Sequence, residues 1–186
     1  MAPFQELHNF VTWQDMRGRQ LATELMNSWS FRSIQTLSGI LYKITRNKKY
    51  LAGSVVHFKP GMTAINLAWL IKKLKCREQC KTGAVVFGTL DTWLMRKMNE
   101  YGHFTEISMA ATTALFDPFE IEWSTLFCRL LEIPQRCLPT VIDTDSDKFG
   151  QFKEFGLSIR ICSDASCSIV GENMINRFGS VLKNKI

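Results

Sequence analysis

The chain has 186 residues, of which 46% are hydrophobic and 22% charged, and its net charge is +6. These values are typical of a globular protein, and the length suits one domain with a substantial core. No apolar run approaches the roughly 20 residues that a membrane-spanning helix needs, and the first residues contain no signal-peptide apolar region. We therefore expect a cytoplasmic protein without a membrane span.

An apolar run that ends at Trp13 predicts a strand near residues 9–13, followed by a helix near 18–28. In open α/β sheets, ligands gather just beyond the C-terminal ends of strands. Trp13 is therefore a candidate binding residue. The alternative is that Trp13 belongs to the core and that Asp15 and Arg17 form a purely structural pair.

Residues 33–44 alternate poorly, which leaves a strand and an irregular segment open. β-branched and aromatic residues predict a second short strand near 54–58, before the Pro60-Gly61 turn. Thr63 can cap a helix near 63–75. Its apolar face comprises Ile65, Leu67, Ala68, Trp69, Leu70 and Leu74.

Positive charge is concentrated at the end of this helix and just after it. The residues concerned are Lys72, Lys73, Lys75, Arg77 and Lys81. A nucleic-acid interface would interleave such charges with aromatic or base-reading residues, and few are present here. A solvated helix face is favoured, and no nucleic-acid partner is expected.

Cys76 and Cys80, two of the six cysteines, could supply half of a metal site. The chain has only three histidines and no second close cysteine pair, so the remaining ligands are missing. We expect reduced thiols and no bound metal.

The stretch Val85–Phe119 is the segment around which the rest of the chain is arranged. A short apolar run predicts a strand near 84–87, and apolar residues at helical spacing then predict a helix near 89–98. Either Thr89 or Asp91 can cap this helix.

A further helix is predicted near 106–114. Thr105 can cap it, and Glu106 lies where exposed amides favour a carboxylate. An amphipathic helix near 123–131 follows and is closed by Pro134.

The acidic loop Val141–Lys148 has three alternating aspartates, but it lacks the glycine and the distal glutamate of a calcium-binding loop. It is expected to be a surface connection. Alternating residues predict a half-buried strand near 157–162, with Asp164 just after it and a helix near 166–175.

Together these elements predict an α/β fold with a mixed sheet flanked by helices. The motif Phe87-Gly88-Thr89-Leu90-Asp91-Thr92-Trp93-Leu94, with Thr105 and Ala111-x-Thr113-x-Leu115-Phe116-Asp117, resembles the glycerol-kinase branch of the FGGY carbohydrate kinases, most closely the divergent glycerol kinase 5 group. The match extends in order from Trp13-Gln14-Asp15-x-Arg17 to Asp164 and Gly171-Glu172, over most of the chain.

This resemblance implies that residues 1–186 form part of the N-terminal domain, a ribonuclease-H-like domain of the actin-like ATPase type. It implies ATP-dependent phosphorylation of a carbohydrate or polyol, with Mg²⁺. By position, Trp13 corresponds to an apolar wall against the substrate carbons, and Asp164 to the catalytic base that accepts the hydroxyl proton.

Two substrate-binding positions depart from the family pattern. Gly61 stands where true glycerol kinases have a tyrosine that binds a glycerol oxygen, and Ala165 replaces the glutamine after the catalytic acid. A site built for polyol hydroxyls loses recognition when such partners are absent. Glycerol is therefore expected to bind weakly.

The opening phosphate-binding hairpin, the Arg-Glu pair and the C-terminal ATP-binding domain of the family have no counterparts in this sequence. We expect an incomplete piece of a kinase that is inactive alone and binds neither ATP nor Mg²⁺ by itself. The alternative is a non-catalytic remnant that acts as a binding or regulatory partner. Association into a homo-oligomer is compatible with both interpretations.

Overall fold

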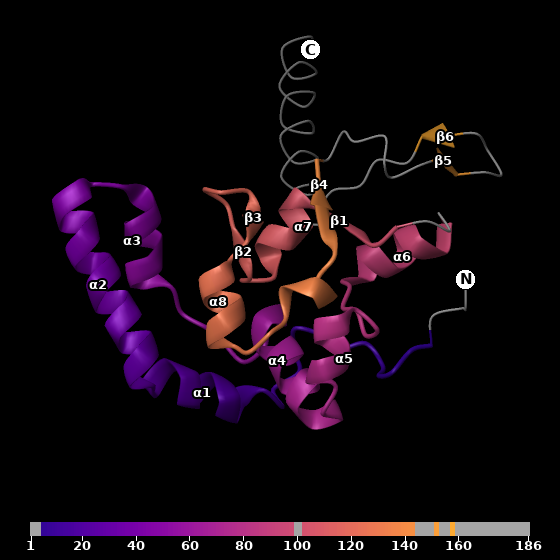
Figure 1. The fold of residues 1–186 in the computed structure, drawn as a ribbon, viewed down its shortest axis with the longest axis horizontal. Coiled ribbons are helices and arrows are strands. Elements are labelled where there is room, and N and C mark those ends of the chain that lie inside the picture. The colour runs from indigo at the N-terminus through magenta and orange to yellow at the C-terminus, as the bar shows by residue number, and fades with distance from the viewer. Residues whose placement is uncertain (1–4, 99–101, 144–150, 153–156, 159–186) are drawn as a thin grey trace, which may run out of the picture. The chain divides into compact units, whose positions relative to one another are not determined.

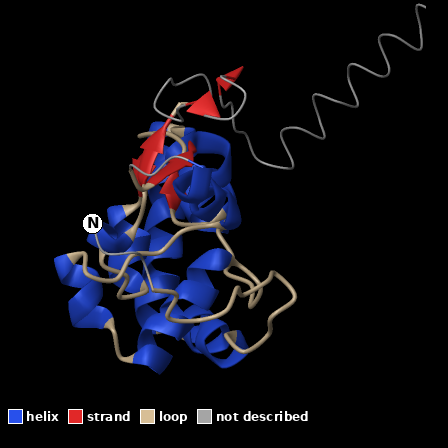
Figure 2. Ribbon diagram, turned by 90° about the vertical axis from the view of Figure 1, so that its right-hand side faces the viewer, coloured by secondary structure: helices blue, strands red, loops and turns tan. Residues whose placement is uncertain are grey.

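The computed structural model describes residues 5–98, 102–143, 151–152 and 157–158. Its contacts divide the chain into two compact units, Met1–Val85 with Thr113–Cys137 (unit 1) and Val86–Thr112 with Leu138–Ile186 (unit 2). Figure 1 shows the order of the elements along the chain, and Figure 2 shows that most of the described chain is helical. The chain alternates between the two units, so each unit contains segments that are distant in sequence.

Unit 1 is built mainly of helices. These are α1 (Arg19–Asn27), α2 (Trp29–Thr45), α3 (Lys48–Val55), α4 (Thr63–Leu74), α5 (Arg77–Thr82), α8 (Thr125–Leu130) and the short 3₁₀ helix η1 (Gln135–Cys137). The two strands β2 (Phe116–Asp117) and β3 (Glu122–Trp123) pair antiparallel. The helices predicted near 18–28 and 63–75 are confirmed. The helix predicted near 123–131 is confirmed only in its central part, because Trp123 lies in β3.

Helices α2 and α3 form a hairpin in the segment for which the sequence left a strand and an irregular segment open. The Ser28 hydroxyl accepts a hydrogen bond from the Phe31 amide (3.2 Å) and so caps α2. The Asn47 side chain caps α3 in the same way. Small residues let the two helices approach closely, since a Cβ atom on Gly53 would lie 2.9 Å from the Ser38 hydroxyl. Helices therefore form in the segment in which apolar and polar residues alternate too poorly for a strand.

Aromatic rings fill the centre of unit 1. The Phe58 ring packs edge-on against Phe31, with centroids 5.8 Å apart, and against Phe127, at 5.3 Å. Helix α4 also buries one side. Its buried residues are Ala64, Ile65, Asn66, Leu67, Ala68 and Ile71.

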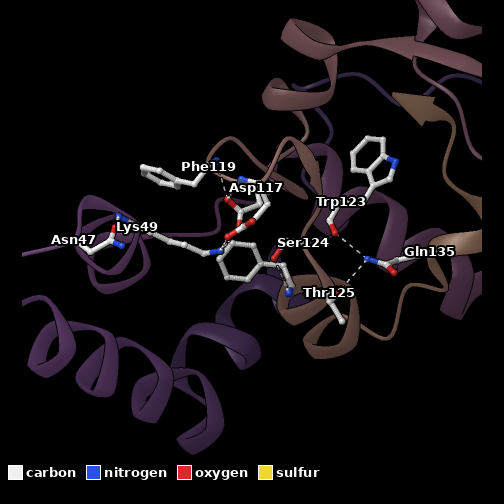
Figure 3. A network of polar contacts seen from close by, with 10 residues as sticks. Asn47, Lys49, Asp117, Phe119, Trp123, Ser124, Thr125 and Gln135 are labelled. Atoms are coloured by element: carbon white, nitrogen blue, oxygen red, sulfur yellow. Dashed lines mark hydrogen bonds and ion pairs between the residues drawn. The ribbon is translucent and has the colours of Figure 1, made fainter. Parts of the chain in front are cut away.

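Lys49 joins the α2–α3 hairpin to the turn between β2 and β3 (Figure 3). Its ammonium lies 3.2 Å from Asp117 Oδ2 and 2.5 Å from Glu120 Oε1. These carboxylates raise the pKa of Lys49, Glu120 contributing most. On the β3 side of the β2–β3 pair, Gln135 donates a hydrogen bond to the Trp123 carbonyl (2.9 Å). Polar contacts thus fix β2 and β3 from both sides.

The strand predicted near 9–13 is wrong, because its end forms a turn. The Thr12 carbonyl accepts hydrogen bonds from the Asp15 amide (3.0 Å) and from the Asn66 side chain (3.4 Å). The carbonyl is thereby used locally and by helix α4, where a strand would offer it to a neighbouring strand.

The strands predicted near 54–58 and 84–87 are also wrong. Ser54 and Val55 complete α3. The Val56 carbonyl accepts from the Gln35 side chain (2.8 Å) and the Phe58 amide contacts the Met26 sulfur (3.4 Å), so side chains of α1 and α2 take the backbone groups. Residues 84–87 have no regular structure in the described chain.

The described part of unit 2 combines short strands with two helices. They are α6 (Leu90–Met98), β1 (Phe104–Glu106), α7 (Ile107–Thr112), β4 (Thr140–Ile142), β5 (Gln151–Phe152) and β6 (Leu157–Ser158). β1 and β4 pair in parallel, with Thr105 opposite Val141, and β5 and β6 pair antiparallel. Met95 and Ile142 form a core cluster against which Phe104 packs. The helix predicted near 89–98 is confirmed, and the strand predicted near 157–162 is described only as β6.

The cap of α7 differs from the prediction. Thr105 lies within β1 and is buried, and Glu106 takes its place as the capping residue. The Glu106 carboxylate accepts hydrogen bonds from the amides of Ser108 (2.9 Å) and Met109 (3.3 Å). Glu106 directly precedes α7, so its carboxylate reaches the first-turn amides. Thr105, one residue earlier, pairs within β1 opposite Val141.

Among the described helices, none is both long enough and apolar enough to span a bilayer.

Candidate functional site

The region around Trp13 brings together two segments of unit 1 that are about 50 residues apart, residues 8–18 and 61–73. The first segment is a turn that leads into α1, and the second comprises the turn before α4 and almost all of α4. Side chains on both segments determine what the region can bind.

Asp15 and Arg17 form a tightly bonded pair on this turn. The Asp15 carboxylate accepts hydrogen bonds from the Arg17 amide (2.9 Å), from Arg17 Nε (2.8 and 3.0 Å) and from a terminal guanidinium nitrogen (2.5 Å). The Arg17 hydrogen bonds lower the pKa of Asp15 to about 2. The pairing expected in the structural interpretation is therefore present, and it fixes the direction of the guanidinium.

The guanidinium of Arg17 lies over the indole of Trp69, with 4.6 Å between its central carbon and the ring centroid. The Lys73 ammonium lies 4.8 Å from the same centroid, and the His8 ring approaches edge-on at 6.4 Å. Cations are attracted to the faces of aromatic rings. Trp69 is thus held by charged neighbours and is not an open stacking surface.

Gly61 makes the closest contact of the region. A Cβ atom on Gly61 would lie 2.0 Å from the Trp13 carbonyl oxygen, a distance that no real side chain allows. Gly18 is similar, since its Cβ would lie 2.6 Å from the Ile65 side chain. The backbone near Trp13 therefore occupies the space in which a larger residue at position 61 would begin.

The Trp13 side chain points away from the core and is 77% exposed. The alternative in which Trp13 belongs to the core is therefore wrong. An exposed indole beside a fixed turn offers an apolar surface that a ligand could cover.

Asn66 is a buried polar residue on the adjacent face of α4. It is only 6% exposed, and its Nδ2 donates to the Thr12 carbonyl at 3.4 Å. Its Oδ1 has no hydrogen-bond partner in the described part of the chain. A buried acceptor without a partner is costly.

The structure describes two of the four predicted site residues. Trp13 and Gly61 are in contact through the Trp13 carbonyl, whereas Asp164 and Ala165 lie outside the described residues. Their predicted roles, together with that of Trp13, remain proposals.

Metal ligands do not converge in the described ranges 5–98 and 102–143: no group of three or more histidine, cysteine or acidic residues is placed to hold an ion. Cys76 and Cys80 have their sulfurs 3.9 Å apart and are buried as free thiols. Burial raises the pKa of Cys80 to about 11.

Sequence reasoning missed the cluster around Trp69. Lys73 follows Trp69 by four residues and so lies on the same face of a helix, a spacing that could have revealed their contact. Arg17 could not have been found in this way, because its position depends on the turn that Asp15 fixes.

A profile of the FGGY family of carbohydrate kinases, N-terminal domain, matches residues 3–156. Glycerol kinase 5 of Bos taurus is 37% identical to this chain over 179 residues, which is 90% of this chain and 33% of that protein. Glycerol kinase 5 of Homo sapiens is 34% identical over 172 residues, with 89% and 32% covered. Glycerol kinase of Geobacter sp. is 31% identical over 139 residues, with 74% and 25% covered.

The crystal structure of Plasmodium falciparum glycerol kinase with ADP matches with a TM-score of 0.64 at 24% identity, over 84% of this chain and 29% of that one. The predicted fold class, an α/β partial domain of the actin-like ATPase type, is confirmed at the level of fold. The chain spans about a third of the length of the curated relatives it matches.

Proposed function

The chain belongs to the FGGY family of carbohydrate kinases, and we propose that it is part of an ATP-dependent kinase that phosphorylates a polyol or sugar hydroxyl. Its relatives named glycerol kinase 5 and glycerol kinase support a kinase with glycerol-like chemistry. The observation in the structure that most favours a substrate site is the exposed Trp13 indole, 77% accessible beside the Gly61 contact.

Trp13 supplies an apolar surface for the carbon side of the substrate. The turn that carries it is fixed by the Asp15–Arg17 pair and by the bond from Asn66 to Thr12, so the indole is presented from a defined backbone. A preorganised surface loses less entropy when a ligand binds.

Asp164 acts as the general base in this proposal. Its carboxylate accepts the proton of the substrate hydroxyl as that oxygen attacks the γ-phosphorus of ATP, and the terminal phosphoryl group passes to the substrate while ADP leaves. Its place in the sequence, after a predicted strand and within an ordered series of family motifs, supports this role.

The substrate differs from glycerol or is bound weakly. The close approach of the Trp13 carbonyl to Gly61 leaves no room for the tyrosine of true glycerol kinases, and Ala165 replaces a glutamine. Each hydrogen bond lost from a polar site weakens binding by roughly 1 kcal/mol. Both departures favour a substrate that makes fewer hydroxyl contacts.

ATP supplies the phosphoryl group, and magnesium would neutralise its charge. The residues that the structure describes do not provide a set of oxygen ligands for magnesium, so we assign the ion to none of them. No feature of the described units favours the alternative of a non-catalytic regulatory partner.

The test is a chimera in which this chain is joined to the phosphate-binding hairpin and C-terminal domain of bovine glycerol kinase 5. ADP release is measured with a panel of polyols and sugars. Asp164→Asn should lower kcat by about a hundredfold or more, and Trp13→Ala should raise KM.

Trp29→Ala is the matched control, because Trp29 is equally exposed but lies on α2. The proposal fails if the chimera is active and Asp164→Asn keeps most of that activity. An unchanged KM in Trp13→Ala would remove Trp13 from the site.

A further inference from the structure

Helix α2 carries an apolar stripe on the side that faces away from α3. The stripe consists of Trp29, Leu37, Ile40, Leu41 and Ile44, all of them exposed, with Trp29 at 83% and Ile44 at 74%. We call these five residues the α2 stripe. Four of them recur at i, i+3, i+4 and i+7, the spacing of one helix face. Ser38 and Gly39, on the opposite face, pack against Gly53 and Ser54 of α3.

The charge around the α2 stripe has one sign. Residues 29–55 contain five basic residues and no aspartate or glutamate. Lys49 is engaged by Asp117 and Glu120, which leaves four cations. These are Arg32, Lys43, Arg46 and Lys48.

Two of the cations border the α2 stripe. Arg32 and Lys43 are exposed and lie 11 residues, or about three turns, apart. They therefore lie on the same side of α2, next to the apolar residues. The helix combines an apolar face, a basic border and a tryptophan at one end.

This charge pattern decides which partner fits. In a symmetric pair of α2 helices from two copies, cations would face cations, which is unfavourable. An anionic partner fits the basic border. The exposed face of a helix is convex. A partner whose surface can deform around the helix is therefore favoured over a rigid partner that must provide a matching groove.

We propose that the α2 stripe docks on an anionic phospholipid surface, with α2 lying in the plane of the membrane. Amphipathic helices of this kind bury their apolar face at the boundary between head groups and acyl chains, while their basic residues contact anionic head groups. Trp29 suits this boundary, because indole rings prefer the interface. The helix has 17 residues and is about 25 Å long, and it lies on the surface without crossing it.

The test is flotation of the full 186-residue chain with phospholipid vesicles. The chain should float with vesicles that contain about one third phosphatidylserine and not with pure phosphatidylcholine, and high salt should weaken binding. Ile40→Asp/Ile44→Asp should lower binding by about tenfold or more.

Two controls make the result specific. Ile121→Asp/Leu126→Asp places the same two charges on other exposed apolar residues of unit 1 and should float like the parent chain. Arg32→Gln/Lys43→Gln leaves the α2 stripe intact and should reduce both the binding and its salt dependence. Circular dichroism checks that each variant keeps its helices.

Several outcomes would overturn the proposal. If the Ile40→Asp/Ile44→Asp variant floats as well as the parent, the vesicles attract the net charge of the whole chain. If the parent does not float but forms dimers that this variant loses, the α2 stripe joins two copies. If the parent binds an acidic polypeptide and not anionic vesicles, the partner is a protein.

Discussion

The carbonyl oxygen of Trp13 occupies the space into which a side chain at Gly61 would project, 2.0 Å from the position of its Cβ atom. Two segments 48 residues apart in sequence are therefore in direct contact at this point, and the contact requires glycine.

Gly61→Ala should destabilise the protein. The added methyl group would collide with a backbone atom, which cannot move aside like the end of a flexible side chain, and overpacking of this kind costs about 1–3 kcal/mol. Gly61→Tyr should cost more and should not restore glycerol binding. Denaturant unfolding monitored by circular dichroism measures the free energy of unfolding.

Gly39→Ala is the control for this change. Its Cβ would lie 3.7 Å from the Ser54 Cβ, an ordinary contact, and alanine in a helix interior is favoured over glycine by about 1 kcal/mol. Gly39→Ala should therefore keep or raise the stability. Equal stability of the two variants would show that the Trp13 backbone can move.

The Asp15–Arg17 pair should stabilise the turn at pH values above 3.8, the ordinary pKa of an aspartate. This contribution should be lost as the pH falls towards 2. The reason is that the folded-state pKa of Asp15 is lowered, to about 2, so the unfolded chain binds the proton first on acidification. The difference in unfolding midpoint between the parent and Asp15→Asn should therefore shrink between about pH 4 and pH 2. Glu6→Gln is the control, and a constant difference for Asp15→Asn would contradict the pairing.

His103 should make the protein less stable under mildly acidic conditions. Its Nε2 donates to the Phe87 carbonyl at 2.5 Å. Burial lowers the pKa of His103, and the charge of Arg96 lowers it further, although the Phe87 bond acts in the opposite direction. The folded state therefore binds a proton less readily than the unfolded state, whose pKa is near 6.5.

Stability should be fully present above that pH and should decline as the pH falls below about 6.5, towards the lower folded-state pKa. Thermal unfolding followed between about pH 5 and pH 7.5 tests this. His103→Gln should flatten the slope, whereas His57→Gln leaves His103 in place and should retain it. A parent slope that survives in His103→Gln would assign the effect to another group.

The buried cysteines should be slow to react with thiol reagents in the native protein. Burial raises the pKa of Cys128 to about 11 and raises that of Cys137 as well, so thiolate is scarce at neutral pH. The measurement is release of an aromatic thiolate in a Cys162→Ser/Cys167→Ser background. Reaction should be slow in buffer and fast in concentrated guanidinium, and fast reaction of all remaining thiols in buffer would contradict the packing.

The helices near 18–28, 63–75 and 89–98 were predicted correctly because the signals that define them are local, whereas α2 and α3 were missed. Ala22 and Leu25 of α1 are buried at helical spacing, and α4 follows the same rule with Ala64, Ala68 and Ile71. These patterns can be recognised without knowing what each helix packs against.

Strands were predicted poorly because a strand depends on its partner. The run that ends at Thr12 has the composition of a strand, yet its carbonyl bonds to Asn66, 54 residues away. No local pattern contains that information. At the candidate site, resemblance alone indicated Trp13, whereas the position of Arg17 over Trp69 required the three-dimensional structure.

The alternation of the chain between its two units has a consequence for protein synthesis. Met1–Val85 cannot complete unit 1 until Thr113–Cys137 has been made, and β1 has no parallel partner until Thr140–Ile142 emerges. At 5–20 residues per second, the first segment waits for roughly 3–10 seconds. During that interval the Ala64 amide of α4 lacks the Thr113 carbonyl to which it later donates a hydrogen bond (3.0 Å), so we expect the nascent chain to be most exposed to chaperones and proteases before residue 137 leaves the ribosome.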